Sequence, residues 1–191
     1  MSFKIILASN SPRRKDLLTK MGVDFEVRIK EINEDFPSNL SPKEVAEYLA
    51  KKKSNAYRES VSKNELVITA DTLVSSEDKI LNKPETKEEA RQMLEFLSNN
   101  THEVITGVSL MTRENQLVFS VISKVTFGEL SALDINKYVD SGLPMDKAGA
   151  YGIQDWIGTI AVTKIEGSYE NIVGLPTQEL YRQLKALGAI N

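Results

Sequence analysis

Apolar runs and helix-start signals alternate along the first half of the chain. The run Phe3–Ala8 predicts a buried strand, and Ser11-Pro12 predicts a helix start, because serine is a common N-cap and proline suits the first turn. The apolar run Leu66–Ala70 predicts another buried strand, which we expect to end abruptly at Asp71. The pattern also predicts a strand over Phe25–Ile29 and helices that open at capping boxes beginning with Ser41 and Thr86.

Longer apolar segments dominate the second half. The segments His102–Thr112 and Gln116–Glu129 predict long strands joined as an antiparallel hairpin. The pattern then predicts a helix from Ser131 to about Gly142, a glycine-bearing loop over Gly149–Gln154, a strand over Gly158–Glu166 and a helix over Pro176–Leu187. These elements predict one α/β domain over residues 1–191, with a mixed, long-stranded, twisted sheet flanked by helices.

Composition narrows the classes of protein to be considered. Of 191 residues, 41% are hydrophobic and 27% are charged, which is ordinary for a globular protein with its own core. The net charge of -3 argues against a nucleic-acid-binding or membrane-surface protein, since both need a basic face. The sequence has no cysteine, which excludes disulfides and thiolate chemistry, and it has no apolar stretch of the roughly 20 residues that span a bilayer. We expect a cytoplasmic protein.

The first candidate for chemistry is the segment Ser9–Arg14. A buried strand, a polar turn and a helix N-terminus together make an anion site, because free backbone N–H groups and the helix dipole favour negative charge. The cations Arg13 and Arg14 in the first turn oppose that dipole, which favours a phosphate-binding role. Two solvated arginines on a helix surface are the equally weighted alternative.

Carboxylates and lysines supply the second set of candidates. Asp71, expected at a strand end, is suited to hold Mg²⁺ or to activate a water, although a lone aspartate there is more often a turn or cap residue. Glu34 is a second carboxylate that could reach a metal, with an acidic surface turn as its alternative. Lys53 and Lys83 are weak signals alone, because solvated lysines are common.

The loop Asp146–Gln154 is the last candidate segment. Its small residues permit close approach of a ligand, and the carboxamide of Gln154 has both the donor and the acceptor needed to read a base edge. A structural turn is the alternative. The single histidine, His102, cannot form a histidine-based metal site, so we interpret it as structural support. Trp156 is expected to pack in the protein or at a dimer surface.

Together these segments resemble the Maf-like nucleoside triphosphate pyrophosphatase family. The resemblance rests on Ser9–Arg14, Ala70-Asp71-Thr72, Lys83-Pro84, Asp146–Gln154, Gly167-Ser168-Tyr169 and Val173–Pro176, which follow one another in the family's order over nearly the whole chain. It implies an α/β fold related to inosine triphosphatase-like enzymes, with two lobes around a central cleft. It also implies hydrolysis of a nucleoside triphosphate between the α- and β-phosphates, with Mg²⁺ or Mn²⁺ as cofactor.

The resemblance also implies roles for individual residues. Asp71 would be the general base, and Lys53 and Lys83 would be catalytic cations. Glu34 would join Asp71 in binding the metal. The substrate-binding residues would be Ser9, Arg13, Arg14, Thr72, Lys147 and Gln154.

The sequence resembles the family's dTTP/UTP subgroup. That subgroup pairs Arg13 with Thr72 and Gln154, whereas a 7-methyl-GTP subgroup has an aromatic residue, Gln and Glu near these places. The alternatives are a housecleaning pyrophosphatase for modified or other nucleotides, and a nucleotide-binding regulator of cell division. The resemblance further implies a homodimer, and its link to arrest of septum formation raises a division protein as a partner.

Overall fold

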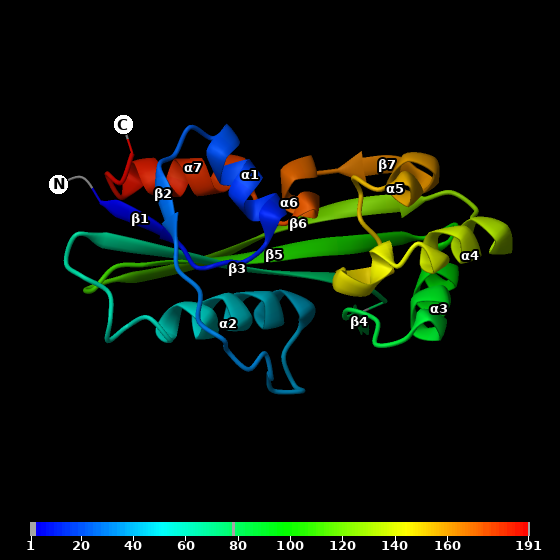
Figure 1. Ribbon diagram of the computed structural model, residues 1–191, viewed down its shortest axis with the longest axis horizontal. Helices are drawn as coiled ribbons and strands as arrows, with labels where there is room; N and C mark the ends of the chain where they lie inside the picture. The colour runs from blue at the N-terminus through cyan, green and yellow to red at the C-terminus, as the bar shows by residue number, and fades with distance from the viewer. Residues whose placement is uncertain (1–2, 78, 191) are drawn as a thin grey trace. The chain divides into compact units, whose positions relative to one another are not determined.

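The computed structural model describes residues 3–77 and 79–190, which form a mixed α/β fold around one sheet (Figure 1). Within this part of the chain the sheet has seven strands in the order β2-β1-β3-β5-β6-β7, and β4 pairs with β3. The strands are β1 (Lys4–Leu7), β2 (Phe25–Val27), β3 (Glu65–Ser76), β4 (Lys79–Leu81), β5 (Thr101–Met111), β6 (Gln116–Phe127) and β7 (Val162–Glu166). The β1 strand pairs in parallel with β2 and β3, whereas β4 and β7 pair antiparallel with their neighbours. The prediction of a mixed, long-stranded sheet is confirmed.

Four of the helices in the described part of the chain begin at the predicted caps Ser11, Ser41, Thr86 and Ser131. The helices are α1 (Pro12–Lys20), α2 (Pro42–Asn55), α3 (Lys87–Leu97), α4 (Ala132–Asp140), α5 (Trp156–Ala161), α6 (Tyr169–Val173) and α7 (Thr177–Ala186), with short 3-10 turns η1 (Leu143–Asp146) and η2 (Ala148–Ala150). The Ser41 capping box is complete, and so is the one at Ser131. The box at Thr86 is only half formed, because the Glu89 carboxylate accepts from the Glu85 N–H instead.

The chain divides into two compact units. The first unit comprises Met1–Asp71, Thr106–Val121 and Gly174–Asn191, and the second comprises Thr72–Ile105 and Ile122–Val173. The long strands β3, β5 and β6 contribute residues to both units. One domain over residues 1–191 and a cleft between two lobes stay predictions.

The first unit packs helices on both sides of its strands. Figure 1 shows α2 on one side of these strands and α1 and α7 on the other. The helix α2 approaches β5 closely at Gly107, where an added Cβ would lie 2.2 Å from the Ala46 carbonyl oxygen. A glycine is therefore required at this contact. The strands β1 and β3 run in the same direction, and the N-terminus of α1 follows the carboxyl end of β1.

The second unit has a core built from helices α3, α4 and α5 and the strand segments beside them. Its buried side chains include Leu94, Phe127 and Tyr138, each at most 2% exposed. His102 is buried among them, and its ring meets those of Phe127 and Tyr151 edge-on. The interpretation of His102 as structural support fits this packing.

Two predicted elements differ from the structure. The β3 strand does not end at Asp71 but continues to Ser76, because Leu73 and Val74 continue the buried run beyond Asp71 and Thr72. The predicted strand Gly158–Glu166 is a strand only from Val162, since the residues before it form helix α5. In the part of the chain that the structure describes, none of the helices has the length and apolar character that crossing a membrane requires.

Candidate active site

Three predicted site residues meet in the first unit around one ammonium group. Lys53 Nζ lies 2.5 Å from Asp71 Oδ1 and 2.7 Å from Glu34 Oε1. The lysine comes from the last turn of α2, the aspartate from β3 and the glutamate from the irregular segment between β2 and α2. The side chains of Lys53 and Asp71 are only 16% and 12% exposed, whereas Glu34 is 54% exposed. Lys53 is therefore not a solvated lysine: its ammonium is held between two carboxylates.

Arg14 ties three separate segments of the first unit together. Its Nε donates to the Gly174 carbonyl at 2.9 Å, and its Nη1 donates to the Ala70 carbonyl at 2.9 Å. Nη1 also lies 3.4 Å from Ser9 Oγ. Burial lowers the pKa of the Arg14 guanidinium and the nearby Asp71 carboxylate opposes that shift, so the side chain stays protonated. Arg14 thus fixes the main chain directly before Asp71.

The N-terminus of α1 keeps the character of an anion site. Ser11 is the N-cap and its side chain accepts from the Arg14 N–H, while the Ser11 N–H donates to Ser9 Oγ at 3.2 Å. Proline occupies the first turn, as predicted. The half-buried Arg13 side chain lies in the same turn. The geometry therefore places a buried hydroxyl, a helix dipole and arginine charge in one place, which suits phosphate oxygens.

The second unit holds the remaining candidates. Lys83 follows β4, is exposed, and makes no hydrogen bond or ion pair with any described residue. The Gly149 N–H donates to the Asn82 carbonyl at 3.2 Å, so the Lys83 segment lies beside the loop that carries Lys147 and Gln154. Gly149 has φ of 68° and packs against Val74, where an added Cβ would come within 3.0 Å. The predicted close approach in this loop is therefore to the protein itself.

Lys147 and Gln154 differ sharply in what they contact. Lys147 Nζ donates to the Leu143 carbonyl at 2.6 Å and to Asp146 Oδ1 at 2.7 Å, and it lies 3.5 Å from Asp155 Oδ2. Gln154 is exposed, and its side chain makes no hydrogen bond with another described residue. Gln154 is therefore available to a ligand, whereas Lys147 is bonded within its own loop.

Carboxylate oxygens are the donors present for a metal ion. No group of three or more histidine, cysteine, aspartate or glutamate side chains suited to a metal occurs within residues 3–77 and 79–190. Asp71 and Glu34 nevertheless converge on the same point, the Lys53 ammonium. Two carboxylates supplemented by substrate phosphate oxygens are a usual ligand set for Mg²⁺, so these residues fit that ion.

The candidate side chains are distributed over both units, and the groups that support them were not predicted from the sequence. Ser9, Arg13, Arg14, Glu34, Lys53 and Asp71 lie in the first unit, and Thr72, Lys83, Lys147 and Gln154 lie in the second. The carbonyl acceptors of Arg14 carry no sequence signal, because any residue has a carbonyl. Tyr138 and Asp155, which contact the Gln154 loop, lie 17 positions apart and were not among the candidates.

Comparisons with known proteins show which proteins this chain is similar to. A family described as "Maf-like protein" matches residues 4–187. The chain is 49% identical to the dTTP/UTP pyrophosphatase of Parabacteroides distasonis, covering 96% of this chain and 95% of that protein. It is 50% identical to the protein of the same name from Bacteroides thetaiotaomicron, covering 97% and 96%. The Ham1 protein of Staphylococcus aureus has a similar fold, with 16% identity, a TM-score of 0.56 and coverage of 96% and 99%.

Proposed function

Because the chain belongs to the Maf-like protein family, we propose that it hydrolyses dTTP and UTP to the nucleoside monophosphate and pyrophosphate. The observation that carries the proposal is that relatives bearing this activity in their names match almost the entire chain at about half identity. The cluster of Lys53, Asp71 and Glu34 supports it, because such a cluster offers a base, a cation and metal ligands at one point.

The reaction needs one proton acceptor and one electrophilic phosphorus. A water oxygen attacks the α-phosphorus, the bond to the α–β bridging oxygen breaks, and pyrophosphate leaves with the electron pair of that bond. Asp71 accepts the proton of the attacking water, because a carboxylate at a buried, fixed position can act as a general base. Arg14 holds the Ala70 carbonyl next to it and so fixes the backbone of the base.

Charge neutralisation is the second requirement, since attack on a polyanion is opposed by repulsion. Lys53 keeps positive charge within 2.7 Å of both carboxylates until substrate arrives. When Mg²⁺ or Mn²⁺ is bound by Asp71 and Glu34, it supplies charge neutralisation and lowers the pKa of water. Ser9, Arg13 and the α1 N-terminus suit phosphate oxygens in the first unit. A role of Lys83 as a second catalytic cation stays a prediction.

Recognition of the base falls to the second unit. The uracil or thymine edge has two carbonyl acceptors and one N–H donor, and the Gln154 carboxamide matches one of each. Thr72 adds a hydroxyl in this unit. The specificity role of Arg13, which lies in the first unit, stays a prediction. Lys147 binding to substrate stays a prediction, since its ammonium is bonded to Leu143, Asp146 and Asp155 in this structure.

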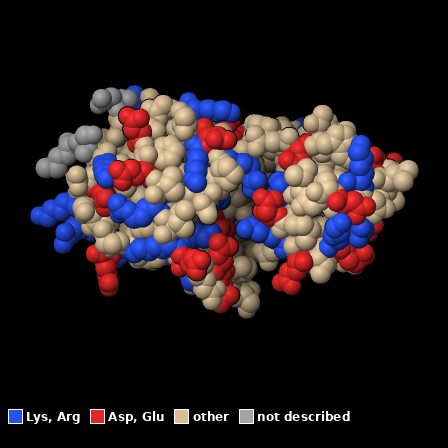
Figure 2. Space-filling model, viewed as in Figure 1, with Lys and Arg blue, Asp and Glu red and all other residues tan. Residues whose placement is uncertain are grey.

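The place of action and the partners are also proposals. We place the enzyme in the cytoplasm, where nucleoside triphosphates are made and used. A homodimer and a division-protein partner stay predictions. Figure 2 shows basic and acidic side chains interspersed on the visible face, which gives a nucleic-acid backbone no continuous basic stripe there.

The direct test is a panel of nucleoside triphosphates with product identification. We expect dTTP and UTP to give monophosphate and pyrophosphate with Mg²⁺ or Mn²⁺, and chelation by EDTA to abolish turnover. Release of inorganic phosphate and a diphosphate would overturn the assigned bond. Preference for a modified or purine nucleotide would favour the housecleaning alternative, and nucleotide binding without turnover would favour a regulator.

A further inference from the structure

We propose that Tyr138 and Asp155 are positioning residues that set the base specificity of the enzyme by fixing the backbone on which Gln154 stands. The inference rests on the proposed function, because it concerns how the pyrimidine is recognised. It deepens that function by assigning two residues outside the motifs.

The side chain of Gln154 is not held by any polar contact of its own with a described residue. Its side chain is exposed and has no hydrogen bond to another described residue, so no neighbouring side chain aims it. A long side chain reads a base selectively only when its backbone is held still, because otherwise binding has to order it first. The residues on either side of Gln154 therefore set the backbone position from which its side chain reaches a base.

The Tyr138 hydroxyl makes contact on both sides of Gln154. It donates to Asp155 Oδ2 at 2.5 Å and accepts the Gly152 N–H at 3.2 Å. Tyr138 is itself only 2% exposed and stands on α4, which packs against α3. One rigidly held hydroxyl thus bridges the residue two positions before Gln154 and the residue directly after it.

The Asp155 carboxylate does not cap the helix that it precedes. Asp155 occupies the N-cap position of α5, where an aspartate normally accepts a backbone N–H of the first turn, yet it makes no such bond. The same oxygen that meets Tyr138 lies 3.5 Å from Lys147 Nζ. Asp155 therefore stabilises the contact with α4 and the loop at the expense of its own cap.

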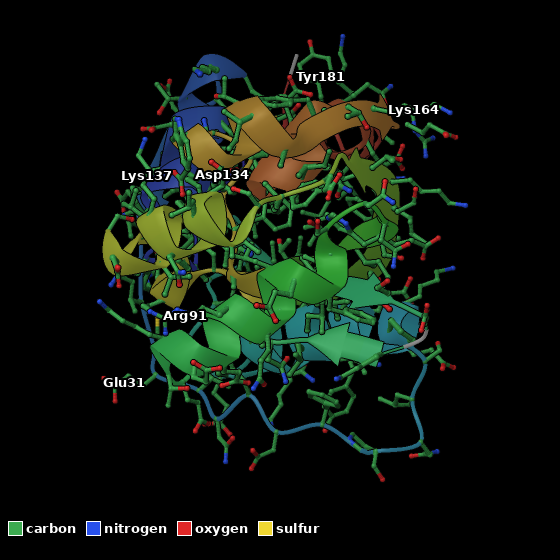
Figure 3. All side chains as sticks on the ribbon, turned by 90° about the vertical axis from the view of Figure 1, so that its right-hand side faces the viewer. Glu31, Arg91, Asp134, Lys137, Lys164 and Tyr181 are labelled. Carbon is green, nitrogen blue, oxygen red and sulfur yellow. The ribbon has the colours of Figure 1, made fainter. Side chains whose placement is uncertain are left out.

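Two further contacts tighten the same short segment. The Asp155 N–H donates to the Gly152 carbonyl at 3.0 Å, which closes a turn around Gln154. Lys137, the α4 neighbour of Tyr138, places its Nζ 4.1 Å from the centre of the Trp156 ring. Figure 3 labels Lys137 on α4, together with Asp134 from the first turn of that helix.

Gly152 shows how little space the network leaves. An added Cβ at Gly152 would lie 2.6 Å from Asp155 Oδ2 and 2.8 Å from Lys147 Cε. A side chain at this position would therefore displace the ends of the Asp155 and Lys147 side chains and disturb their contact.

Charged groups surround the hydrogen bond between Tyr138 and Asp155 on several sides. The groups that face the Tyr138–Asp155 contact are Lys147 and, through Lys147, Asp146, with Lys137 over Trp156 on the α4 side. The burial of Tyr138 and its bond to Asp155 raise the pKa of the phenol far above its usual range. The hydroxyl therefore keeps its proton and stays a donor across the working pH range.

The experiment compares Tyr138→Phe with wild type in the ratio of kcat/KM for dTTP to kcat/KM for GTP. Tyr138→Phe removes only the hydroxyl oxygen, and we expect the ratio to fall about fivefold, mostly through a higher KM for dTTP with kcat largely kept. The ratio is measured on one preparation, so a lower fraction of folded protein does not change it. Asp155→Asn, which keeps the size of the side chain, should lower the ratio in the same direction and serves if Tyr138→Phe does not fold.

A double-mutant cycle separates positioning through Gln154 from a general structural effect. In the background of Gln154→Ala, Tyr138→Phe should change the ratio no further, because the side chain that it positions is already gone. Tyr57→Phe is the matched control: Tyr57 is 1% exposed and its hydroxyl donates to the Arg28 carbonyl at 2.8 Å, in the first unit. That control should lower stability and leave the ratio unchanged.

The outcomes distinguish failure of the proposed function from failure of the inference about Tyr138 and Asp155. A wild-type enzyme that does not turn over dTTP or UTP refutes the proposed function. A wild-type enzyme that prefers dTTP, with an unchanged ratio in folded Tyr138→Phe and Asp155→Asn, refutes the inference alone. An equal loss of ratio in the Gln154→Ala background, or in Tyr57→Phe, also refutes it, because the effect would then not pass through Gln154.

Discussion

Lys53 Nζ lies 2.5 Å from Asp71 Oδ1, so a side chain of α2 neutralises a carboxylate in the middle of β3. The same ammonium lies 2.7 Å from Glu34 Oε1 and therefore stands between the two proposed metal ligands. The proposed base and the proposed metal ligands are thus preorganised around a cation of the protein itself.

Removing the Lys53 ammonium should lower the rate of turnover and strengthen the binding of Mg²⁺. In Lys53→Met we expect kcat for dTTP to fall about a hundredfold, since one charge-stabilising donor is typically worth that much. Mg²⁺ alone should raise the thermal midpoint of this variant more than that of wild type, because no ammonium then competes at Glu34 and Asp71.

Lys52→Met is the control for this change. Lys52 is its neighbour on α2, and its Nζ donates to the Asp35 main-chain carbonyl at 2.8 Å. The control should keep wild-type turnover and a wild-type response to Mg²⁺. Wild-type turnover in Lys53→Met would remove Lys53 from the mechanism.

Exchanging the carboxamide of Gln154 should change which base is preferred. Gln154→Glu loses the N–H donor for a pyrimidine carbonyl but keeps acceptors for the N–H groups of guanine. We expect the ratio of kcat/KM for dTTP to that for GTP to fall about tenfold or more, as expected when a buried polar match is lost. Gln178→Glu, at an exposed position of α7, should leave the ratio as it was. A constant ratio in Gln154→Glu would exclude Gln154 from base recognition.

The sequence predicted the features that depend on neighbouring residues. The caps Ser11, Ser41 and Ser131 form as expected, because a capping side chain bonds to the backbone three positions away. The apolar face of α3 could also be predicted from the sequence, since Met93, Leu94 and Leu97 follow the helical period.

Features decided by distant contacts were not predictable in this way. A polar residue after an apolar run suggested a strand end at Asp71, but burial on both sides carries β3 through it. The network of Tyr138, Lys147 and Asp155 depends on how α4 packs against the loop, and no local pattern reports that packing. The residues that hold the candidate side chains in place were therefore not predicted, and the roles of the candidates themselves stay predictions.

The ion pair between Arg28 and Glu65 should set part of the acid stability. Arg28 Nη1 and Nη2 lie 3.2 and 2.7 Å from the two Glu65 carboxylate oxygens, and the Ser62 N–H donates to the same group at 3.0 Å. The Arg28 bonds, followed by that of Ser62, lower the pKa of Glu65 from 4.5 to about 2. Because the folded-state pKa is lowered, this contribution is present above about pH 4.5 and disappears as the pH falls toward 2.

Glu65→Gln tests that contribution. We expect a loss of about 2 kcal/mol in the free energy of unfolding at pH 7, reduced from the full pKa effect because solvent screens the partly exposed Arg28. The loss should shrink as the pH falls below 4.5. Glu179→Gln removes a similar two-bond pair with Arg182 on the surface of α7 and should cost about 0.5 kcal/mol or less. Urea titrations at several pH values measure both, and equal losses in the two variants would contradict the account.

His102 should govern stability between pH 6.5 and 4. Burial lowers the pKa of this histidine from 6.5 to about 4, so the folded protein keeps it neutral while the unfolded chain binds a proton. Stability therefore falls as the pH decreases through this window, by at most about 3 kcal/mol. His102→Gln should be less stable at pH 7, because the contacts with Tyr151 and Phe127 are lost, but should show a flatter pH dependence. The sequence has one histidine, so an unchanged slope in the variant would contradict the assignment.

The role of Asp71 as the base is tested by measuring pyrophosphate release from dTTP by wild type and by Asp71→Asn under the same conditions. The exchange keeps the size of the side chain, so the circular dichroism spectrum should be unchanged. We expect rapid metal-dependent release by wild type and a loss of about 10²–10⁴-fold in the variant, because a general base contributes about that much to the rate. Wild-type release of pyrophosphate by folded Asp71→Asn would contradict the assignment of Asp71 as the base and, with it, the proposed active site.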